Sequence, residues 1–291
     1  PENFPEPTYT FSNYPITKEG FELGKRLFFD PILSRDASVS CNTCHIQATG
    51  FADSQQHPLS IGIDNRIGMR NAPPLTNLAF KEEFFWDGGV THLDFVPLNA
   101  IESEVEMDET LENVVRKLNI HPEYPALFKE AFDADTIALP FILQALSQFT
   151  VMMVSADSKY DKFVRNEGEM LNADELEGQR VFQAKCASCH SGELFTDQSY
   201  RNNGLADIFP SLRNANRTAP YMHNAKCWTQ REVLDHYDTG IVDSPTLDPM
   251  LKRNGQFGIE LSEVEKDRII DFLKTLSDFD FVANTKFMVN Q

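Results

Sequence analysis

The stretch "SVSCNTCHIQ", residues 38–47, places two cysteines three positions apart and a histidine directly after the second. The same arrangement returns in "KCASCHSG", residues 185–192. Each copy follows a similar segment, "GKRLFF" from residue 24 and "GQRVFQ" from residue 178. The chain is therefore built from two halves that repeat one local plan.

The pattern C-x-x-C-H is the signature of covalent attachment of a c-type haem. Its spacing suits the chemistry, because the two thiols add to the two vinyl groups of one porphyrin and the adjacent histidine binds the iron. Five cysteines and seven histidines in 291 residues would rarely produce one match by chance, and this chain has two. The predicted haem residues are Cys41, Cys44 and His45 for the first haem, and Cys186, Cys189 and His190 for the second.

Two other interpretations of the cysteine pairs are weaker. A four-ligand zinc site would need both pairs in one place and would leave the following histidines without a role. A thioredoxin-like redox pair prefers a βαβ context, which the sequence pattern lacks. The remaining cysteine, Cys227, is interpreted as a small buried hydrophobic residue rather than a redox group.

The net charge of the chain limits the classes of partner that it can bind. Its 26 basic and 44 acidic residues give a net charge of −18, so we expect no basic stripe that could neutralise nucleic-acid phosphates. The acidic field suits a basic electron donor or partner protein. An apolar run of about 18 residues, which a membrane span would need, is missing. Because covalent haem attachment takes place outside the bacterial cytoplasm, we expect an exported, periplasmic protein in its mature form, which begins at Pro1.

Apolar periodicity predicts a mainly α fold with long ordered loops. The expected helices are 18–29, 108–119, 124–133, 137–154, 173–185 and 262–276. Asn172 and Ser262 are expected to cap the last two of these helices. Residues 46–103 are rich in Gly, Pro, Asn and Asp and are expected to form loops. We predict two similar domains with one haem each, an N-terminal domain at 1–165 and a C-terminal domain at 166–291.

Motifs outside the haem sites carry a resemblance to a known family. They are "LFFDPILSRDASVSCNTCH", "MRNAPPLTN", "FFWDGG", "VEM", "PSLRNANRTAPYMHN" and "EVLDHYDTG", in this order. Together, over residues 20–276, they resemble the bacterial dihaem cytochrome c peroxidase and MauG family. The resemblance implies two c-type cytochrome domains with a calcium ion between them. It also implies that the first haem reacts with hydrogen peroxide and that the second passes electrons to it.

The resemblance assigns roles to individual residues. His45 and His190 match the proximal ligands of the peroxidatic and electron-transfer haems, and Trp86 matches a tryptophan that lies between the haems. Glu106 matches a distal glutamate that moves protons during cleavage of the O–O bond, a task that suits a carboxylate. Glu102 and Glu104 are close in sequence, but the register with Met107 favours Glu106. Asn71, Thr218 and Pro220 match the calcium site, through a side-chain amide and backbone oxygens.

Three features depart from the pattern of the ordinary dihaem peroxidases. Many members carry an iron-binding histidine where this chain has Ile63, which cannot bind iron, and His57 is the alternative ligand six residues earlier. Ordinary peroxidases carry a methionine where this chain has Tyr237, as MauG-like members do. The competing ligands for the second iron are Met222 and Met250. Between Asp207 and Ile208, the longer loop of the family is nearly absent.

The sequence thus predicts a peroxidase of the MauG-like branch that reduces hydrogen peroxide to water, with electrons relayed through the second haem. One alternative is oxidation of a protein or organic substrate through a high-valent dihaem state, as in MauG. Another is a dihaem electron carrier without catalysis. The expected donor is a small cytochrome c or cupredoxin, and a homodimer is expected because family members often pair.

Overall fold

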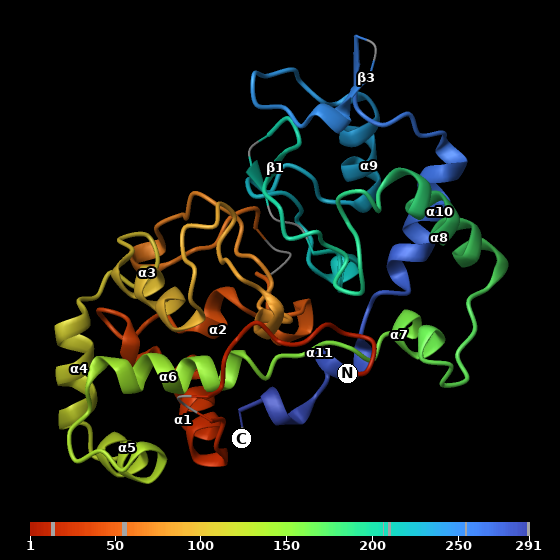
Figure 1. The fold of residues 1–291 in the computed structure, drawn as a ribbon. Helices are drawn as coiled ribbons and strands as arrows, with labels where there is room; N and C mark the ends of the chain where they lie inside the picture. The colour runs from red at the N-terminus through yellow and green to blue at the C-terminus, as the bar shows by residue number, and fades with distance from the viewer. Residues whose placement is uncertain (13–14, 54–56, 206, 209–210, 254, 290–291) are drawn as a thin grey trace. The chain divides into compact units, whose positions relative to one another are not determined.

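The computed structural model describes residues 1–12, 15–53, 57–205, 207–208, 211–253 and 255–289. Within this part the chain is mainly helical, and its paired strands form two short antiparallel ladders (Figure 1). The mainly α fold class predicted from the sequence is confirmed. Among the described residues, no helix has the length and apolar character that crossing a membrane requires.

The chain divides into two compact units, which we name by the histidine of each C-x-x-C-H motif. The His45 unit comprises Pro7–Phe84, Val90–Val154 and Ala283–Gln291. The His190 unit comprises Pro1–Glu6, Phe85–Gly89 and Ser155–Val282. Short terminal segments are thus exchanged between the halves of the sequence. The predicted division into 1–165 and 166–291 stays a prediction, and it does not contain this exchange.

One close helix pair forms the centre of the His45 unit. The helices of this unit are α1 (Lys18–Phe29), α2 (Cys41–Cys44), α3 (Val96–Glu102), α4 (Leu111–Ile120), α5 (Tyr124–Phe132) and α6 (Leu139–Thr150). α1 packs against α6 at Gly24, where an added Cβ would lie 1.8 Å from the carbonyl oxygen of Ala145. Only glycine allows this approach, because any larger side chain would push the two backbones apart.

The His190 unit repeats this arrangement. Its helices are α7 (Lys159–Val164), α8 (Ala173–Lys185), α9 (Gln230–Thr239), α10 (Glu263–Lys274) and α11 (Phe279–Val282). α8 packs against α10 at Gly178, where an added Cβ would lie 1.9 Å from the carbonyl oxygen of Arg268. Gly24 and Gly178 open the two similar sequence segments that precede the cysteine motifs. The repeat in the sequence therefore has a structural reason, which is a close helix crossing in each unit.

Aromatic side chains fill both cores. In the His45 unit, a contiguous group comprises Phe21, Phe28, Phe51, Phe149 and Phe287. In the His190 unit, the corresponding group comprises Tyr160, Phe182, Phe195 and Phe272. Large rings bury much apolar area each, so these groups contribute a large share of the hydrophobic stabilisation.

The remaining elements are short. β1 (Arg201–Asn202) pairs with β2 (Asp207–Ile208), and β3 (Lys252–Arg253) pairs with β4 (Gln256–Phe257), both antiparallel. Short 3-10 helices comprise Pro31–Leu33, Gln47–Thr49, Ile63–Asn65, Leu78–Phe80, Leu93–Phe95, Ala215–Arg217, Pro249–Leu251 and Thr285–Phe287. The place where the family has a longer loop falls within β2, and Ala206 beside it lies outside the described residues.

The predicted helices are confirmed with small changes at their ends. α1 and α8 match the predicted bounds, and Asn172 caps α8 as predicted, with a capping box to Glu175. α4, α6 and α10 begin or end a few residues from the predicted positions. Five of the described helices were not predicted: the short helices α2, α7 and α11, α3 in the segment expected to form loops, and α9, which carries Tyr237.

Candidate haem sites

The first cysteine motif forms a single helical turn, α2. Ser40 and Thr43 form a capping box at its start, and the backbone N–H of His45 closes the turn by donating to the carbonyl oxygen of Cys41 at 2.9 Å. Cys41 and Cys44 are both half-buried. Burial, together with the neighbouring thiol, raises the pKa of Cys41 to about 12.

The imidazole of His45 lies against two backbone carbonyl groups, those of Phe51 and Pro73. Its Nδ1 lies 2.9 Å from the carbonyl oxygen of Phe51, which leaves Nε2 as the nitrogen for an iron ion. Phe51 and Gly50 have positive φ angles of 59° and 68°, which turn the chain back toward the histidine. Burial lowers the pKa of His45 and favours its neutral, ligating form. A metal-binding histidine usually donates its other N–H to a carbonyl, so this site fits a haem.

Glu106 lies beside the same motif. The backbone N–H of Ile63 donates to the carbonyl oxygen of Glu106 at 2.9 Å. The contact needs Gly62, where an added Cβ would lie 2.2 Å from the carbonyl oxygen of Val105. Burial raises the pKa of Glu106, and its negative charge in turn raises the pKa of Cys41.

The three glutamates of the acidic segment differ in exposure. Glu106 is half-buried near the thiols of Cys41 and Cys44, whereas Glu102 and Glu104 are exposed. A carboxylate held away from water is suited to proton transfer, because burial brings its pKa nearer to neutrality. Of the three, only Glu106 is half-buried, so its role at the haem stays a prediction that its burial favours.

Two residues bear on the iron-binding histidine of many family members, namely Ile63 at the matching position and His57 six residues earlier. The side chain of Ile63 is fully buried and offers no donor atom. The half-buried His57 has its Nδ1 3.8 Å from the carboxylate of Asp53. Asp53 also accepts a short hydrogen bond from Ser60, and its charge raises the pKa of Cys44. Residues 54–56, which join Asp53 to His57, lie outside the described part of the chain.

The second motif follows directly from α8. Cys186 is the C-cap of α8, and the backbone N–H of His190 donates to its carbonyl oxygen at 3.0 Å. The loop after His190 is held by Arg213, whose Nε donates to the carbonyl oxygen of Glu193 at 2.7 Å. Arg213 in turn forms a bidentate pair with Asp161, with N–O distances of 2.8 and 2.9 Å, and both side chains are fully buried.

Tyr237 reaches the second motif from α9. Burial raises the pKa of Tyr237 to about 12, and the charges of Cys189 and Cys186 act in the same direction. The side-chain N–H of Asn203 donates to the Tyr237 hydroxyl at 3.2 Å and to the sulfur of Met222 at 3.6 Å. Tyr237 and Met222 therefore lie at one place, so both stay candidate ligands.

Two further residues of this region have clear positions. Met250 is 49% exposed on a 3-10 helix, which makes it a poor ligand candidate. Trp86 packs with Tyr237 and Tyr221 against a small buried cluster formed by Met222 and Cys227. Trp86 thus belongs to the surroundings of the second motif, and Cys227 is buried, as predicted.

The residues predicted to bind calcium come from both compact units. Asn71 is buried in the His45 unit, whereas Thr218 is half-buried and Pro220 buried in the His190 unit. Among the described residues, no group of three or more His, Cys, Asp or Glu side chains could hold a metal ion. The calcium prediction rests instead on amide, hydroxyl and backbone oxygens.

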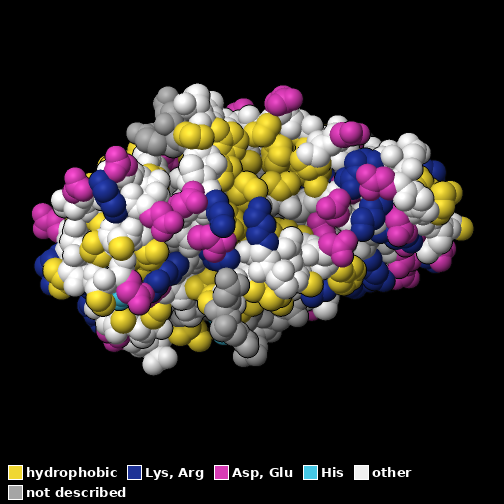
Figure 2. Space-filling model, turned by 90° about the horizontal axis from the view of Figure 1, so that it is seen from below, with side chains coloured by type: hydrophobic (Ala, Val, Ile, Leu, Met, Phe, Trp, Pro, Cys, Tyr) yellow, Lys and Arg dark blue, Asp and Glu magenta, His cyan; other side chains and the backbone are white. Residues whose placement is uncertain are grey.

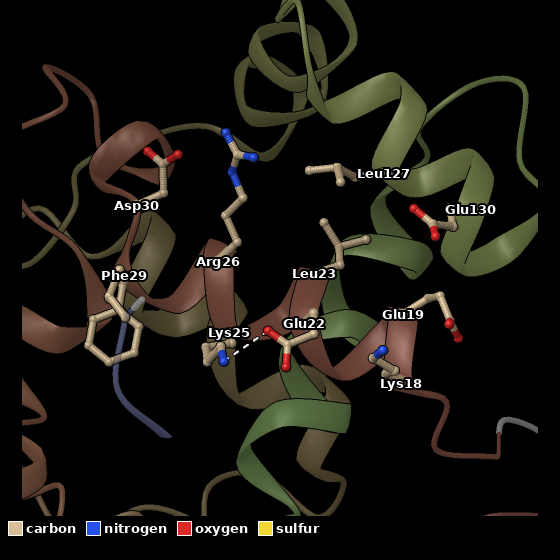
Figure 3. Close-up of a pocket in the computed structure, with 11 residues that line it drawn as sticks. Lys18, Glu19, Glu22, Leu23, Lys25, Arg26, Phe29, Asp30, Leu127 and Glu130 are labelled. Carbon is tan, nitrogen blue, oxygen red and sulfur yellow. Dashed lines mark ion pairs between the residues drawn. The ribbon is translucent and has the colours of Figure 1, made fainter. Parts of the chain in front are cut away.

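A groove of about 630 Å³ runs along α1 and α5. Charged side chains dominate it, and Figure 3 shows Lys25 paired with Glu22, with Arg26 and Glu130 also lining the groove. None of the described residues that line it is a predicted site residue. On the face drawn in Figure 2, basic side chains lie among acidic ones, so the net negative charge is not segregated there.

Comparison with known proteins supports the assignment of two haem domains. The family model "Di-haem cytochrome c peroxidase" matches residues 18–169, and the model "Cytochrome c" matches residues 176–277. The methylamine utilization protein MauG of Methylorubrum extorquens is 33% identical over 300 residues, which cover 95% of this chain and 82% of MauG. The cytochrome c551 peroxidase of Pseudomonas aeruginosa is 30% identical over 303 residues, which cover 94% of this chain and 83% of that enzyme.

A solved structure extends the similarity to three dimensions. The crystal structure of a MauG-like protein associated with microbial copper homeostasis matches with a TM-score of 0.87 and 28% identity. The match covers 99% of this chain and 97% of the other. The predicted family is confirmed, and with it a peroxidase-type oxidoreductase that carries one haem in each cytochrome c domain. This chain belongs to the di-haem cytochrome c peroxidase family.

Proposed function

We propose that the protein is a periplasmic peroxidase of the MauG-like branch, whose first haem reacts with hydrogen peroxide without prior reduction. Cys41, Cys44 and His45 would hold this haem. The observation that carries the proposal is Ile63, which stands where many family members have an iron-binding histidine. Its side chain is fully buried and its backbone is bonded to Glu106, so this position offers no iron ligand.

Glu106 is the proposed proton-transfer group. Its carboxylate takes a proton from one peroxide oxygen and delivers it to the other, which leaves as water. The raised pKa of this half-buried carboxyl makes it a stronger base than an exposed glutamate and a ready proton donor once protonated. In total, hydrogen peroxide, two protons and two electrons give two molecules of water.

The haem contributes chemistry that side chains lack, since its iron, when bound, accepts a peroxide oxygen and exchanges electrons. The protein contributes the position of His45. The hydrogen bond from Nδ1 to the carbonyl oxygen of Phe51 orients the ring and increases the electron density on Nε2. A histidine that donates more strongly would stabilise the ferric form of the haem that it holds.

The second haem would be held by Cys186, Cys189, His190 and Tyr237. An anionic phenolate oxygen stabilises the more charged iron states, which lowers the reduction potential. Asn203 donates to this oxygen and so keeps it in one position. Trp86 packs on the same cluster as Tyr237, and we propose it as the group through which the two haems exchange electrons.

The test is rapid mixing of the fully ferric holoprotein with one equivalent of hydrogen peroxide, followed by visible and near-infrared absorption. We expect an immediate spectral change without added reductant. A reaction that begins only after one haem is reduced would contradict the proposal. The variant His57→Ala then identifies the cause, because it would restore the direct reaction if His57 blocks the iron.

A second function, oxidation of a protein or organic substrate, is supported by Tyr237 together with the similarity to MauG. Reduced cytochrome c, added after peroxide, distinguishes the two. Oxidation of two equivalents of cytochrome c per peroxide supports the peroxidase. An oxidised protein that persists beside the reduced donor supports the substrate oxidase. A dihaem carrier would leave the first mixing experiment without a spectral change.

Further parts of the proposal concern partners and calcium. A small basic electron donor, a cytochrome c or a cupredoxin, suits the net charge of −18, and such binding would weaken as salt is added. A homodimer is proposed from the family resemblance. Asn71, Thr218 and Pro220 would hold calcium, and chelation followed by calcium analysis and repeated peroxide mixing tests that site.

A further inference from the structure

The last described residues of the chain lie against the loop that holds His45. Residues 283–291 follow α11 of the His190 unit but are assigned to the His45 unit. Thr285–Phe287 forms a 3-10 helix that Asn284 caps through the N–H of Lys286. We call Asn284, Lys286 and Phe287 the tail clamp.

The tail clamp contacts the His45 loop at two places. At the start of the loop, the side-chain amide of Gln47 donates to the carbonyl oxygen of Asn284 at 2.8 Å, and Gln47 is only 8% exposed. At its end, the ring of Phe287 meets the ring of Phe51 edge-to-face, with centroids 6.1 Å apart. Both rings are buried, at 3% and 0% exposure.

Both contacts are made to the loop that carries the carbonyl oxygen of Phe51, the atom that orients the histidine. The carbonyl oxygen of Phe51 lies 2.9 Å from Nδ1 of His45, and the backbone N–H of Leu75 donates to the same oxygen at 3.3 Å. Phe51 has a φ of 59°, a conformation that a bulky residue adopts only when its surroundings hold it. The ring of Phe287 is part of those surroundings, because it covers one side of the Phe51 ring while Phe28 packs against another.

The tail clamp is also anchored to the core. Phe287 packs on Phe21 and Phe149, which belong to α1 and α6. Lys25 of α1 donates to the carbonyl oxygen of Lys286 at 3.3 Å, and the ammonium of Lys286 lies 4.9 Å from the centroid of the Phe21 ring. The clamp therefore joins the close helix pair of this unit to the loop that orients His45.

We propose that the tail clamp positions His45 and thereby sets the reduction potential of the first haem. By holding Phe51 in place, it keeps the carbonyl oxygen on Nδ1 and gives the imidazole partial imidazolate character. Loss of the clamp would lengthen this hydrogen bond. A weaker axial donor stabilises the ferric state less, so the potential of the first haem would rise.

The test compares Phe287→Ala with Phe128→Ala in the two-haem holoprotein. Phe128 is a fully buried ring of the same unit that packs on Tyr124 and Phe132. Both variants remove one buried phenyl ring and should lower the melting temperature. Only Phe287→Ala should raise the potential of the first haem and lower the iron–histidine stretching frequency of its ferrous form. The potential of the second haem should stay at the wild-type value.

A milder variant covers the case in which Phe287→Ala does not fold. Gln47→Ala removes one hydrogen bond of the clamp and should move the same two signals in the same direction, by less. Equal potentials in wild type and in the clamp variants would overturn the proposal. An equal shift of the first haem's potential in Phe128→Ala would also overturn the proposal, because general loosening of the unit would then explain the shift.

The inference rests on His45 as an axial ligand, as proposed above. A wild-type protein without an iron–histidine signal from the first haem would overturn that assignment and the clamp with it. Slow or absent reaction with peroxide would contradict only the proposed function, because neither the potential nor the stretching frequency involves peroxide.

Discussion

The backbone N–H of Ile63 donates to the carbonyl oxygen of Glu106 at 2.9 Å. This bond joins the loop that could supply a distal ligand to the segment that carries the proposed proton-transfer group. Gly62 makes the contact possible, since an added Cβ would overlap the backbone of Val105 and Glu106. A change on either segment is therefore expected to affect the other.

Replacement of Ile63 by histidine should block the reaction of the first haem with peroxide. A histidine at this position could bind the iron, so only the fraction of molecules with the ligand released would react with peroxide. We expect the direct reaction of the ferric protein to slow by roughly tenfold or more and to recover after reduction of the second haem. Stopped-flow absorption measures both. The control is Ile63→Gln, which places a polar side chain of similar size at the same buried position and should react at once.

The variant Glu106→Gln should lose proton transfer while keeping its shape. We expect the rate of the peroxide reaction to fall by roughly 10²–10⁴-fold, the usual contribution of a general acid–base group. Glu104→Gln, an exposed glutamate two residues earlier, should react like the wild type. Equal rates in both variants would remove Glu106 from the mechanism.

The pH dependence of the peroxide reaction tests the same assignment of Glu106 as the proton-transfer group. The deprotonated carboxylate of Glu106 is the base, and burial raises its pKa above the usual range. The rate should therefore rise with pH through this raised pKa and level off above it. Glu106→Gln should lose this limb of the profile. A rate that is flat from pH 4 to pH 7 in the wild type would contradict the assignment.

The variant Tyr237→Phe should raise the potential of the second haem. It removes the phenol oxygen but keeps the ring, so the iron loses an anionic ligand that stabilises the ferric state. Tyr221→Phe is the matched control, because Tyr221 packs on the same cluster. Potentiometric titration checks the result. If Met222 is the ligand, Tyr237→Phe will leave both the potential and the absorption spectrum of the second haem as in the wild type.

Loss of Arg213 should destabilise the His190 unit strongly. Its bidentate pair with Asp161 is fully buried, so Arg213→Ala leaves a buried carboxylate without its partner. The expected loss in the free energy of unfolding is about 3–5 kcal/mol. Arg180→Ala breaks an exposed pair with Glu177 and should leave stability unchanged. Denaturant unfolding, with the haems attached, measures both.

Much of the candidate chemistry was predictable because it depends on local sequence. The C-x-x-C-H spacing is a property of one helical turn and the residue after it. α8 was predictable from Asn172 and its capping box. The same signal, Thr229 with Glu232, precedes α9 and could have revealed that helix. α3 offered less, because seven residues are too few to show a helical period.

Other features depend on contacts between residues far apart in the sequence. Glu102, Glu104 and Glu106 share one acidic segment, and the local sequence does not encode that Glu106 alone is half-buried, beside the loop at Gly62. No local sequence pattern predicts the exchange of the terminal segments either. Phe4 covers the guanidinium of Arg213, with 4.3 Å between the guanidinium carbon and the ring centroid.

The sequence by itself determined the number of haem sites, the family and the repeated helical plan, because each rests on spacing within a few residues. Only the tertiary structure showed that Glu106 is half-buried while Glu102 and Glu104 are exposed, and that Asn203 holds Tyr237 and Met222 together. It also decided that the tail clamp lies on the loop of His45. These relationships arise from burial and packing between distant segments, and no local pattern of residues encodes where such segments meet.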